Sequence, residues 1–252
     1  MRRLPALLLA TLATSGFAQE KAPAIPRLTA MAPLEVVPGV TTTLRLRGIK
    51  LNETRDLEFL DVPSQPGIEI REKKNAEIPN GLDAKEAGDT QLEIKLTVPA
   101  DWQPGTVRFR IVSGSERTDP CKLHVIAPAS LIEEKEPNGS FREAQPIDCG
   151  KVVRGMIKEE KDVDVFQFTG RARTTIWAGI VAVRHASLLD SALHLYDSAG
   201  QLLAANDDSA ADRDASLHFR IPADGTYFLT VTDANDRGGQ WNAFELILKE
   251  LP

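Results

Sequence analysis

Short runs of alternating apolar and charged residues are the feature that most restricts the fold of this chain. In the first half they lie at 42–47, 92–96 and 107–111, separated by Pro-Gly turns. Such alternation indicates antiparallel strands with one buried face. Eight further candidate strands occupy the second half, where helical periodicity is absent apart from a single candidate turn near 141–144. We therefore predict an all-β protein made of two tandem antiparallel β-sandwiches, an immunoglobulin-like one followed by a jelly-roll-like one.

The first 18 residues predict a signal peptide. Arg2 and Arg3 give a basic start, residues 4–13 are mostly apolar, and the small residues at 16–18 suit cleavage after Ala18. The apolar run is too short for a spanning helix, and no later stretch is long and apolar enough to cross a bilayer. We therefore expect a secreted or periplasmic protein without membrane insertion.

A polar segment near 128–133 divides the chain into two predicted domains, residues 22–128 and residues 129–252. Residues 19–128 hold 15 Lys and Arg against 16 Asp and Glu, whereas residues 129–252 hold 13 against 20. This acidic balance disfavours nucleic acid and anionic membranes as partners, because both attract basic surfaces. It favours binding of a cation by the second half.

The segment between the domains carries the densest group of oxygen ligands in the chain. Pro137 favours an extended conformation at Glu136, and alternate side chains of an extended segment share a side. We therefore expect Glu134, Glu136 and Asn138 to point together and to form half of a site for a hard cation. The alternative is an acidic linker whose side chains are solvated.

An ordered set of motifs runs through the second half. They are Glu134-x-Glu136-Pro137-Asn138, Gly155-x-Ile157, Asp162-Val163-Asp164-Val165-Phe166-x-Phe168, Asp190-x-x-Leu193-x-Leu195-x-Asp197, Asn206-Asp207-Asp208 and Pro222-Ala223-Asp224-Gly225-Thr226-Tyr227. Over residues 131–249 this set resembles the bacterial pre-peptidase C-terminal domain family. Its members are β-sandwiches attached to secreted proteases and other exported proteins. In clostridial collagenases, similar domains bind calcium and collagen.

The resemblance implies a calcium site in the second domain. Five residues match the family's ligand positions: Glu134, Glu136, Asn138, Asp162 and Asp164. Gly139 departs from the family, which often has Asp or Asn there, so one ligand is missing or is replaced by a carbonyl or water. Calcium takes about six to eight oxygens, which five side chains supply if some bind bidentately. The ion would also fasten the linker to the sandwich.

The first half carries weaker motifs. They are Pro26-Arg27-Leu28-Thr29, Gly39 followed by Leu44-Arg45-Leu46-Arg47-Gly48, and Val98-Pro99-Ala100 leading to Pro104-Gly105. This half resembles the IPT/TIG group of immunoglobulin-like domains. Such domains are generally spacers or binding modules, so the resemblance implies no activity.

The two cysteines leave two alternatives open. Cys121 and Cys149 lie 28 residues apart across the domain junction. In an oxidising compartment they either form a disulfide or remain two separate thiols, because the geometry of a bridge cannot be read from spacing.

A second acidic set lies further along the second half. Its members are Asp190, Asp207, Asp208, Asp212 and Asp214. It forms either an exposed loop stabilised by Asx turns or a second cation site.

The sequence contains no motif of a hydrolase. It has neither the Gly-x-Ser-x-Gly elbow nor the His-Glu-x-x-His pair, and we predict that the chain is not an enzyme. We expect an exported binding or display protein whose ligand is a protein or polysaccharide outside the cell. The alternative is an accessory module of an exported protease or hydrolase system.

Overall fold

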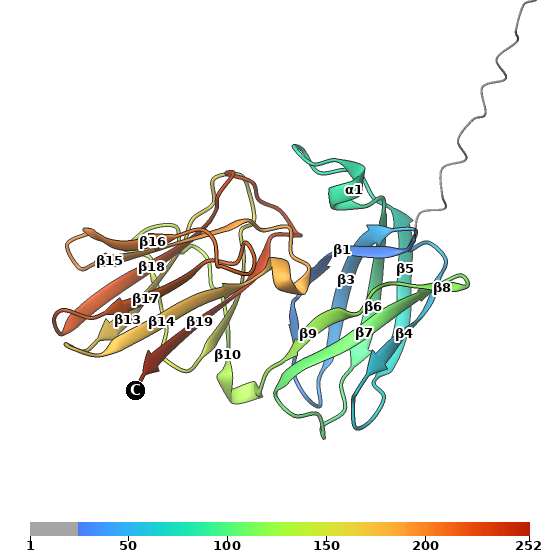
Figure 1. Cartoon of the computed structure of the whole chain (residues 1–252), viewed down its shortest axis with the longest axis horizontal. Coiled ribbons are helices and arrows are strands. Elements are labelled where there is room, and N and C mark those ends of the chain that lie inside the picture. The colour runs from blue at the N-terminus through green and yellow to red at the C-terminus, as the bar shows by residue number, and fades with distance from the viewer. Residues whose placement is uncertain (1–24) are drawn as a thin grey trace, which may run out of the picture.

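The computed structural model describes residues 25–252, so the predicted signal peptide at 1–18 lies outside the described residues. The chain forms two β-sandwiches joined by a short linker (Figure 1). The predicted fold class, two tandem antiparallel β-sandwiches, is confirmed. Over the described residues, every helix is too short or too polar to cross a bilayer.

The N-terminal sandwich has the strand order of an immunoglobulin-like domain. One sheet contains, in order, β1 (Arg27–Ala32), β3 (Thr41–Ile49), β6 (Thr90–Thr97) and β5 (Gly67–Asn75). The other contains β2 (Glu35–Val36), β9 (Cys121–Val125), β7 (Gly105–Ser113) and β4 (Thr54–Leu60), with β8 (Glu116–Arg117) paired to β7. All of these pairs are antiparallel except β2 with β9.

The C-terminal sandwich has the strand order of a jelly roll, in which consecutive strands alternate between two sheets except at the hairpin of β15 and β16. One sheet contains β10 (Leu131–Glu133), β12 (Val152–Met156), β19 (Ala243–Leu251), β14 (Thr175–Val181) and β17 (Ser216–Arg220). The other contains β11 (Gln145–Pro146), β13 (Asp164–Gly170), β18 (Gly225–Asp233), β15 (Ser191–Asp197) and β16 (Leu202–Asn206). The short strands β10 and β11 each run parallel to their neighbour at one edge.

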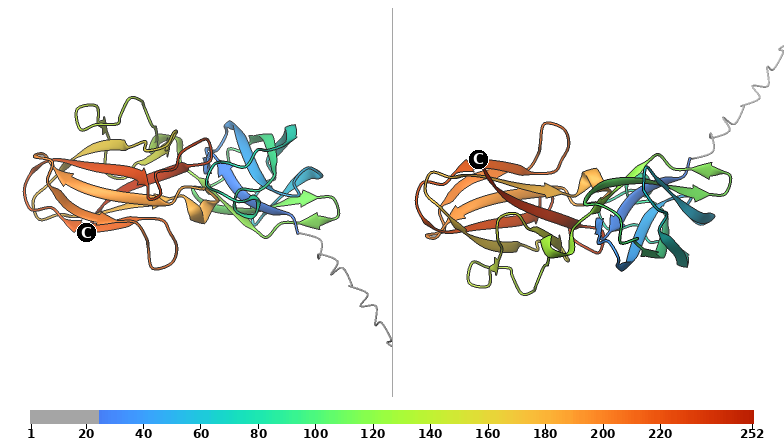
Figure 2. Two further views of the ribbon diagram at one scale, coloured as in Figure 1. Left: turned by 90° about the horizontal axis from the view of Figure 1, so that it is seen from above. Right: turned by 90° about the horizontal axis from the view of Figure 1, so that it is seen from below.

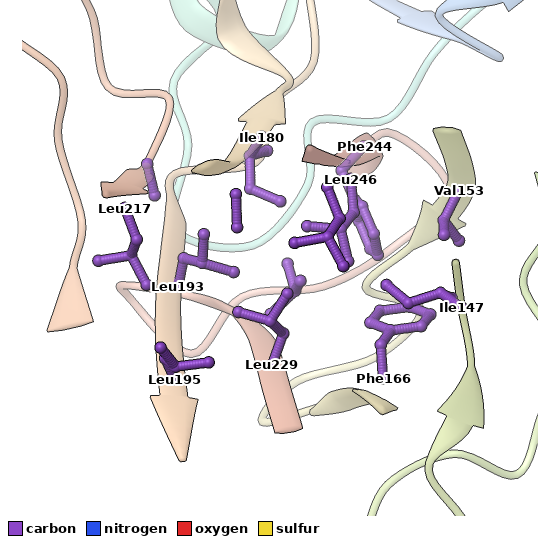
Figure 3. Packing of buried hydrophobic residues seen from close by; sticks show 14 of the residues in the cluster. Ile147, Val153, Phe166, Ile180, Leu193, Leu195, Leu217, Leu229, Phe244 and Leu246 are labelled. Carbon is purple, nitrogen blue, oxygen red and sulfur yellow. The ribbon is translucent and has the colours of Figure 1, made fainter. Parts of the chain in front are cut away.

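Each sandwich encloses its own apolar core. In the C-terminal sandwich, inward side chains of the two sheets meet between the layers (Figure 3). The rings of Phe166 and Phe244 pack edge to face, with centroids 6.3 Å apart. Gly155 leaves room for this packing, because a Cβ there would come within 2.2 Å of the Phe244 ring. Full burial of one such ring contributes about 1.5–3 kcal/mol.

The sandwiches meet end to end (Figure 2), and the linker between them contains the 3₁₀ turn η1 (Pro128–Ser130). Leu34 packs against Ala243 across the junction, and both are buried. A second 3₁₀ turn, η2 (Val183–His185), projects from the C-terminal sandwich toward the N-terminal one (Figure 1). Next to it, the Met31 backbone N–H donates to the Ala186 carbonyl at 2.7 Å. The junction is therefore a packed interface.

The polar composition of residues 73–89 predicts a long loop, and this prediction is wrong in part, because the segment contains regular structure. Strand β5 continues to Asn75, and the single-turn helix α1 (Ala84–Ala87) follows. Asp83 and Glu86 form a reciprocal capping box around α1, which explains why a helical turn forms without apolar periodicity. The last residues of β5 are exposed because this strand lies at the edge of its sheet, so they show no apolar alternation.

Candidate metal centre

The acidic segment after the linker is fastened to both sheets of the C-terminal sandwich. The Glu134 backbone N–H donates to the Arg154 carbonyl at 3.0 Å, which extends the pairing of β10 with β12. Its carboxylate accepts the backbone N–H of Met156 at 3.0 Å. Four residues later, the Asn138 carbonyl accepts the backbone N–H of Val165 at 2.9 Å. These bonds place the segment between β12 and the first residues of β13.

Three carboxylates converge at this place. Glu134, Glu136 and Asp164 each offer an oxygen, and these oxygens lie within 4.8 Å of one another. Asp164 and Asn138 are completely buried, whereas the side chains of Glu134 and Glu136 are 5% and 33% exposed. All of these ligand atoms are hard oxygens, which calcium prefers.

The buried members of this group lack hydrogen-bond donors. Neither carboxylate oxygen of Asp164 has a donor, and the side-chain oxygen of Asn138 has none either. The Asn138 amide nitrogen donates to Glu134 at 3.2 Å, so the amide oxygen is left over. Buried polar atoms are nearly always paired, and leaving one unpaired costs about 1–3 kcal/mol. A cation among these oxygens would satisfy all three.

The carboxylates of this group carry more negative charge than the positive groups nearby neutralise. Burial and the nearby carboxylate of Glu134 raise the pKa of Asp164 far above its usual value. Burial also raises the pKa of Glu134, against a hydrogen bond with the protonated Asp164 carboxyl and the hydrogen bonds that Glu134 accepts from Met156 and Asn138. The ammonium of Lys158 lies 2.8 Å from Glu136 and 3.9 Å from Glu134, and its side chain is half exposed. Without a metal, burial and the neighbouring carboxylates therefore favour the protonated form of Asp164.

Asp162 is not one of the three acids whose oxygens lie within 4.8 Å of one another, although its charge contributes to the raised pKa of Asp164. Its carboxylate accepts the backbone N–H of Lys158 at 2.7 Å and closes the turn that precedes β13. The alternation that would place Asp162 beside Asp164 applies only within a strand, and β13 begins at Asp164. The structure thus gathers Glu134, Glu136 and Asp164, with Asn138 bonded to the first of them.

Two contributors to this site were missed by sequence reasoning. The Met156 backbone N–H follows from the pairing of β10 with β12, which no local pattern reveals. Lys158 lies only four residues before Asp162. A predicted turn over these residues, just before the segment that carries Asp164, would have indicated that Lys158 lies near the acidic group.

Two members of the second acidic set, Asp212 and Asp214, are held by donors of the protein itself. Asp214 is completely buried and accepts the backbone N–H groups of Ala182 and Val183 at 3.1 and 2.7 Å. Its other oxygen accepts from the Arg184 guanidinium at 2.5 Å. Asp212 accepts from the Ser209 hydroxyl at 2.9 Å. Across residues 25–252, the group around Asp164 is the one cluster of His, Cys, Asp or Glu arranged for a metal.

A different buried acidic group lies at the junction of the sandwiches. Glu35 and Glu245 are completely buried, and the Arg154 guanidinium pairs with Glu35. The ring nitrogen Nδ1 of His124 lies 2.7 Å from the Glu245 carboxylate. Burial raises the pKa of Glu35 to about 7, although Arg154 opposes this. Burial lowers the pKa of His124, but the hydrogen bond and charge of Glu245 outweigh it and raise that pKa overall.

The cysteines show the unbridged alternative. Cys121 and Cys149 are both free thiols in the structure. Burial raises the pKa of both, that of Cys121 to about 11. Neither thiol is therefore activated as a nucleophile or metal ligand.

Part of the second half of the chain matches a known protein family. Residues 162–233 match the family model of the bacterial pre-peptidase C-terminal domain. This range includes Asp164 but not the acidic segment at 134–138. The chain is 42% identical over 147 residues to a probable subtilase-type serine protease of Deinococcus radiodurans, which covers 56% of this chain and 18% of that protein. It therefore spans less than a fifth of the length of that relative.

Two solved structures align with parts of the chain. The pre-peptidase C-terminal domain of a collagenase from Bacillus anthracis aligns with a TM-score of 0.36 and 18% identity, over 46% of this chain and 100% of that one. The secreted serine protease VesC from Vibrio cholerae aligns with a TM-score of 0.31 and 11% identity, over 86% of this chain and 48% of that one. The resemblance of the first half to IPT/TIG domains stays a prediction. At residues 162–233 the chain contains a bacterial pre-peptidase C-terminal domain.

Proposed function

We propose that this chain is an exported, non-catalytic module whose C-terminal sandwich is stabilised by calcium, and that it serves an exported protease or hydrolase system. The observation that carries the calcium proposal is Asp164, a completely buried carboxylate with no donor to either oxygen, next to two other carboxylates. The link to a protease is supported by the identity to a subtilase-type enzyme and by the family match.

The residues fit the chemistry of a calcium ion. Glu134, Glu136 and Asp164 would supply carboxylate oxygens and Asn138 its free amide oxygen. When bound, calcium supplies two positive charges and accepts six to eight oxygens in a flexible geometry. Water or a second carboxylate oxygen completes such a shell. Magnesium fits poorly, because it demands a small octahedral site and gives up water reluctantly.

The role of the protein's own residues is to hold the linker. Glu134 bonds to β12 through Met156, and Asn138 bonds to β13 through Val165. Charge repulsion among the acids works against this attachment. Neutralising the acids therefore fixes the segment that leaves the N-terminal sandwich, and with it the spacing between the two domains.

The binding role has two candidate forms. As an accessory module, the chain holds or positions an exported enzyme. As a display module, it binds a protein or polysaccharide outside the cell and acts independently of any enzyme. The similarity to a subtilase-type protease favours the first form.

Isothermal titration with calcium tests the metal proposal. We expect saturable binding of one calcium ion per chain, with a rise in Tm of several degrees, because 100-fold excess over Kd stabilises the folded state by about 2.7 kcal/mol. Asp164→Asn should abolish most of the heat and the Tm shift. Asp207→Asn, at an exposed position, is the matched control and should retain both. Equal binding by the two variants would refute the site.

The two forms of the binding role are separated in the producing bacterium. If the chain is an accessory module, deleting the gene that encodes it should lower the extracellular protease activity. Re-expression of the chain should restore that activity. An unchanged activity would favour the display form. The purified chain alone should not hydrolyse casein or gelatin, and hydrolysis by it would contradict the non-catalytic assignment.

A further inference from the structure

A pocket of about 250 Å³ opens between the two sandwiches, away from the acidic cluster. The N-terminal sandwich lines it with Arg47 and with Leu82 from the segment before α1, and the C-terminal sandwich lines it with Leu188, Arg237 and Trp241. In Figure 1 the segment before α1 leans over the junction toward the C-terminal sandwich. Pockets at domain interfaces are frequent ligand sites, and this one is slightly smaller than the range of about 300–1,000 Å³ for drug-sized molecules. It suits a small group.

One wall of the pocket carries a buried positive charge without a carboxylate in contact. Arg47 is 2% exposed, and its guanidinium donates to the carbonyls of Ala87 at 2.7 Å and Gly88 at 3.0 Å and to that of Glu77. No ion pair forms at Arg47 among the described residues. The guanidinium lies 5.9 Å from the ring centroid of Trp241, so the two side chains form a cation–π pair.

The unpartnered atoms of the lining residues are donors. Trp241 is 3% exposed, and its indole N–H is buried without an acceptor. The Nε–H of Arg237 also makes no hydrogen bond, although the guanidinium forms an ion pair with the buried Asp233 carboxylate at 3.6 Å. Asp233 is occupied by the backbone N–H groups of Asn235 and Arg237. A ligand that completes this pocket must therefore bring acceptors.

Charge and shape narrow the ligand further. Arg47 and Arg237 both line the pocket, and Glu77 is the one carboxylate among the lining residues, on an exposed side chain. Arginine binds carboxylates through two parallel hydrogen bonds. Leu82 and Leu188 add apolar surface, which a small carbon skeleton contacts better than a bare inorganic anion.

We propose that this pocket binds a carboxylate carried on a small ring or short aliphatic skeleton, with Arg237 holding the carboxylate and Trp241 donating its indole N–H. The carboxylate belongs to a sugar acid or to an amino acid at the end of a chain. The site shares no residue with the acidic cluster, so it stands or falls independently of calcium binding. It uses both sandwiches, and a ligand here would also fix their relative orientation.

Indole NMR signals test this directly, because the chain has three Trp residues and Trp241→Phe assigns the signal of Trp241. The probes are glucuronate and N-acetylalanine, compared with glucose and N-acetylalanine amide as neutral counterparts. We expect one of the carboxylates to move the Trp241 indole proton downfield in a saturable way, and neither neutral probe to do so. Which carboxylate binds more tightly identifies the source, sugar acid or amino acid.

Variants of Arg237 separate recognition from folding. Arg237→Gln should raise the Kd of the bound probe about tenfold or more, since it removes a charge-assisted bidentate contact. Arg237→Lys keeps the charge and should give a smaller increase, and Arg142→Gln, at an exposed position, should give none. The proposal fails if no carboxylate moves the indole signal at 50 mM. It also fails if the neutral probes bind equally, or if Arg237→Gln folds normally and leaves the Kd unchanged.

Discussion

Asp164 and Asp214 are both completely buried in the C-terminal sandwich, yet their surroundings differ. Asp214 accepts the backbone N–H groups of Ala182 and Val183 and pairs with the Arg184 guanidinium. Asp164 has no donor to either oxygen, and the charge that acts on it most strongly is another carboxylate, that of Glu134. The protein supplies donors for the carboxylate of Asp214, whereas the carboxylate of Asp164 requires a proton or an external cation.

The junction acids lie between these extremes. Glu35 has Arg154, and Glu245 has His124, but the second oxygen of each carboxylate lacks a donor. The comparison shows that abundance of carboxylates does not indicate a metal site. What distinguishes a candidate site is buried oxygens for which the fold supplies no donor.

The largest expected effect is the loss of stability when Asp214, rather than Asp164, is substituted. Asp214→Asn should lower the free energy of unfolding by about 2–4 kcal/mol, because it removes a buried carboxylate charge that pairs with the Arg184 guanidinium and accepts two backbone N–H groups. Asp164→Asn, measured in calcium-free buffer, should change it by less than about 1 kcal/mol or increase it, because the new amide donates to Glu134 and removes a buried acid. Urea unfolding of both variants measures the difference. Equal losses would show that Asp164 is as well satisfied as Asp214.

A smaller effect concerns the pH dependence of the junction. The pKa of Glu35 is about 7 in the folded chain against an ordinary 4.5, so the folded state holds this proton more tightly. Glu35 therefore makes the free energy of unfolding fall as pH rises from 4.5 to 7. Glu35→Gln should remove that fall, on the order of 1–3 kcal/mol.

His185 gives the opposite sign and is the control. Burial, with the nearby His124, lowers its pKa to about 4 from 6.5, so the folded state binds fewer protons between these values. His185 therefore makes the free energy of unfolding rise with pH between 4 and 6.5. His185→Gln should remove this rise. Parallel pH profiles of the two variants in urea unfolding would contradict the assignment of the charges.

The smallest expected effect is the change in calcium affinity when Lys158 is substituted. Its ammonium lies 2.8 Å from Glu136, where it repels a bound divalent cation. Lys158→Met should lower the Kd for calcium about three- to tenfold, a change on the order of 1 kcal/mol that is typical of an exposed charge. Lys95→Met, at an exposed position in the N-terminal sandwich, should not change it. Weaker calcium binding by Lys158→Met would mean that Lys158 supports the site.

The sequence predicts the local part of this architecture well. Alternation along 92–96 and 107–111 predicts β6 and β7, and the turn at 197–200 predicts the reversal between β15 and β16. Glu134 and Glu136 are predicted to point together because Pro137 keeps the segment extended, and their carboxylates do converge. Short-range geometry is enough for these features.

Long-range contacts are what the sequence does not predict. Asp162 satisfies the same alternation as Asp164, but β13 begins only at Asp164, so Asp162 closes a turn. The pairing of Arg154 with Glu35 joins residues 119 positions apart, and it depends on how the two sandwiches meet. The spacing of residues in the sequence does not predict this ion pair. Which side chains are buried and paired at an interface depends on the tertiary structure.

Anomalous diffraction from crystals grown with millimolar calcium tests the central claim most directly. We expect an anomalous peak at about 2.3–2.6 Å from oxygens of Glu134, Glu136 and Asp164 and from the amide oxygen of Asn138. The same peak should vanish in crystals of Asp164→Asn. No peak at this place, or a peak confined to the loop around Asp207 and Asp212, would contradict the account.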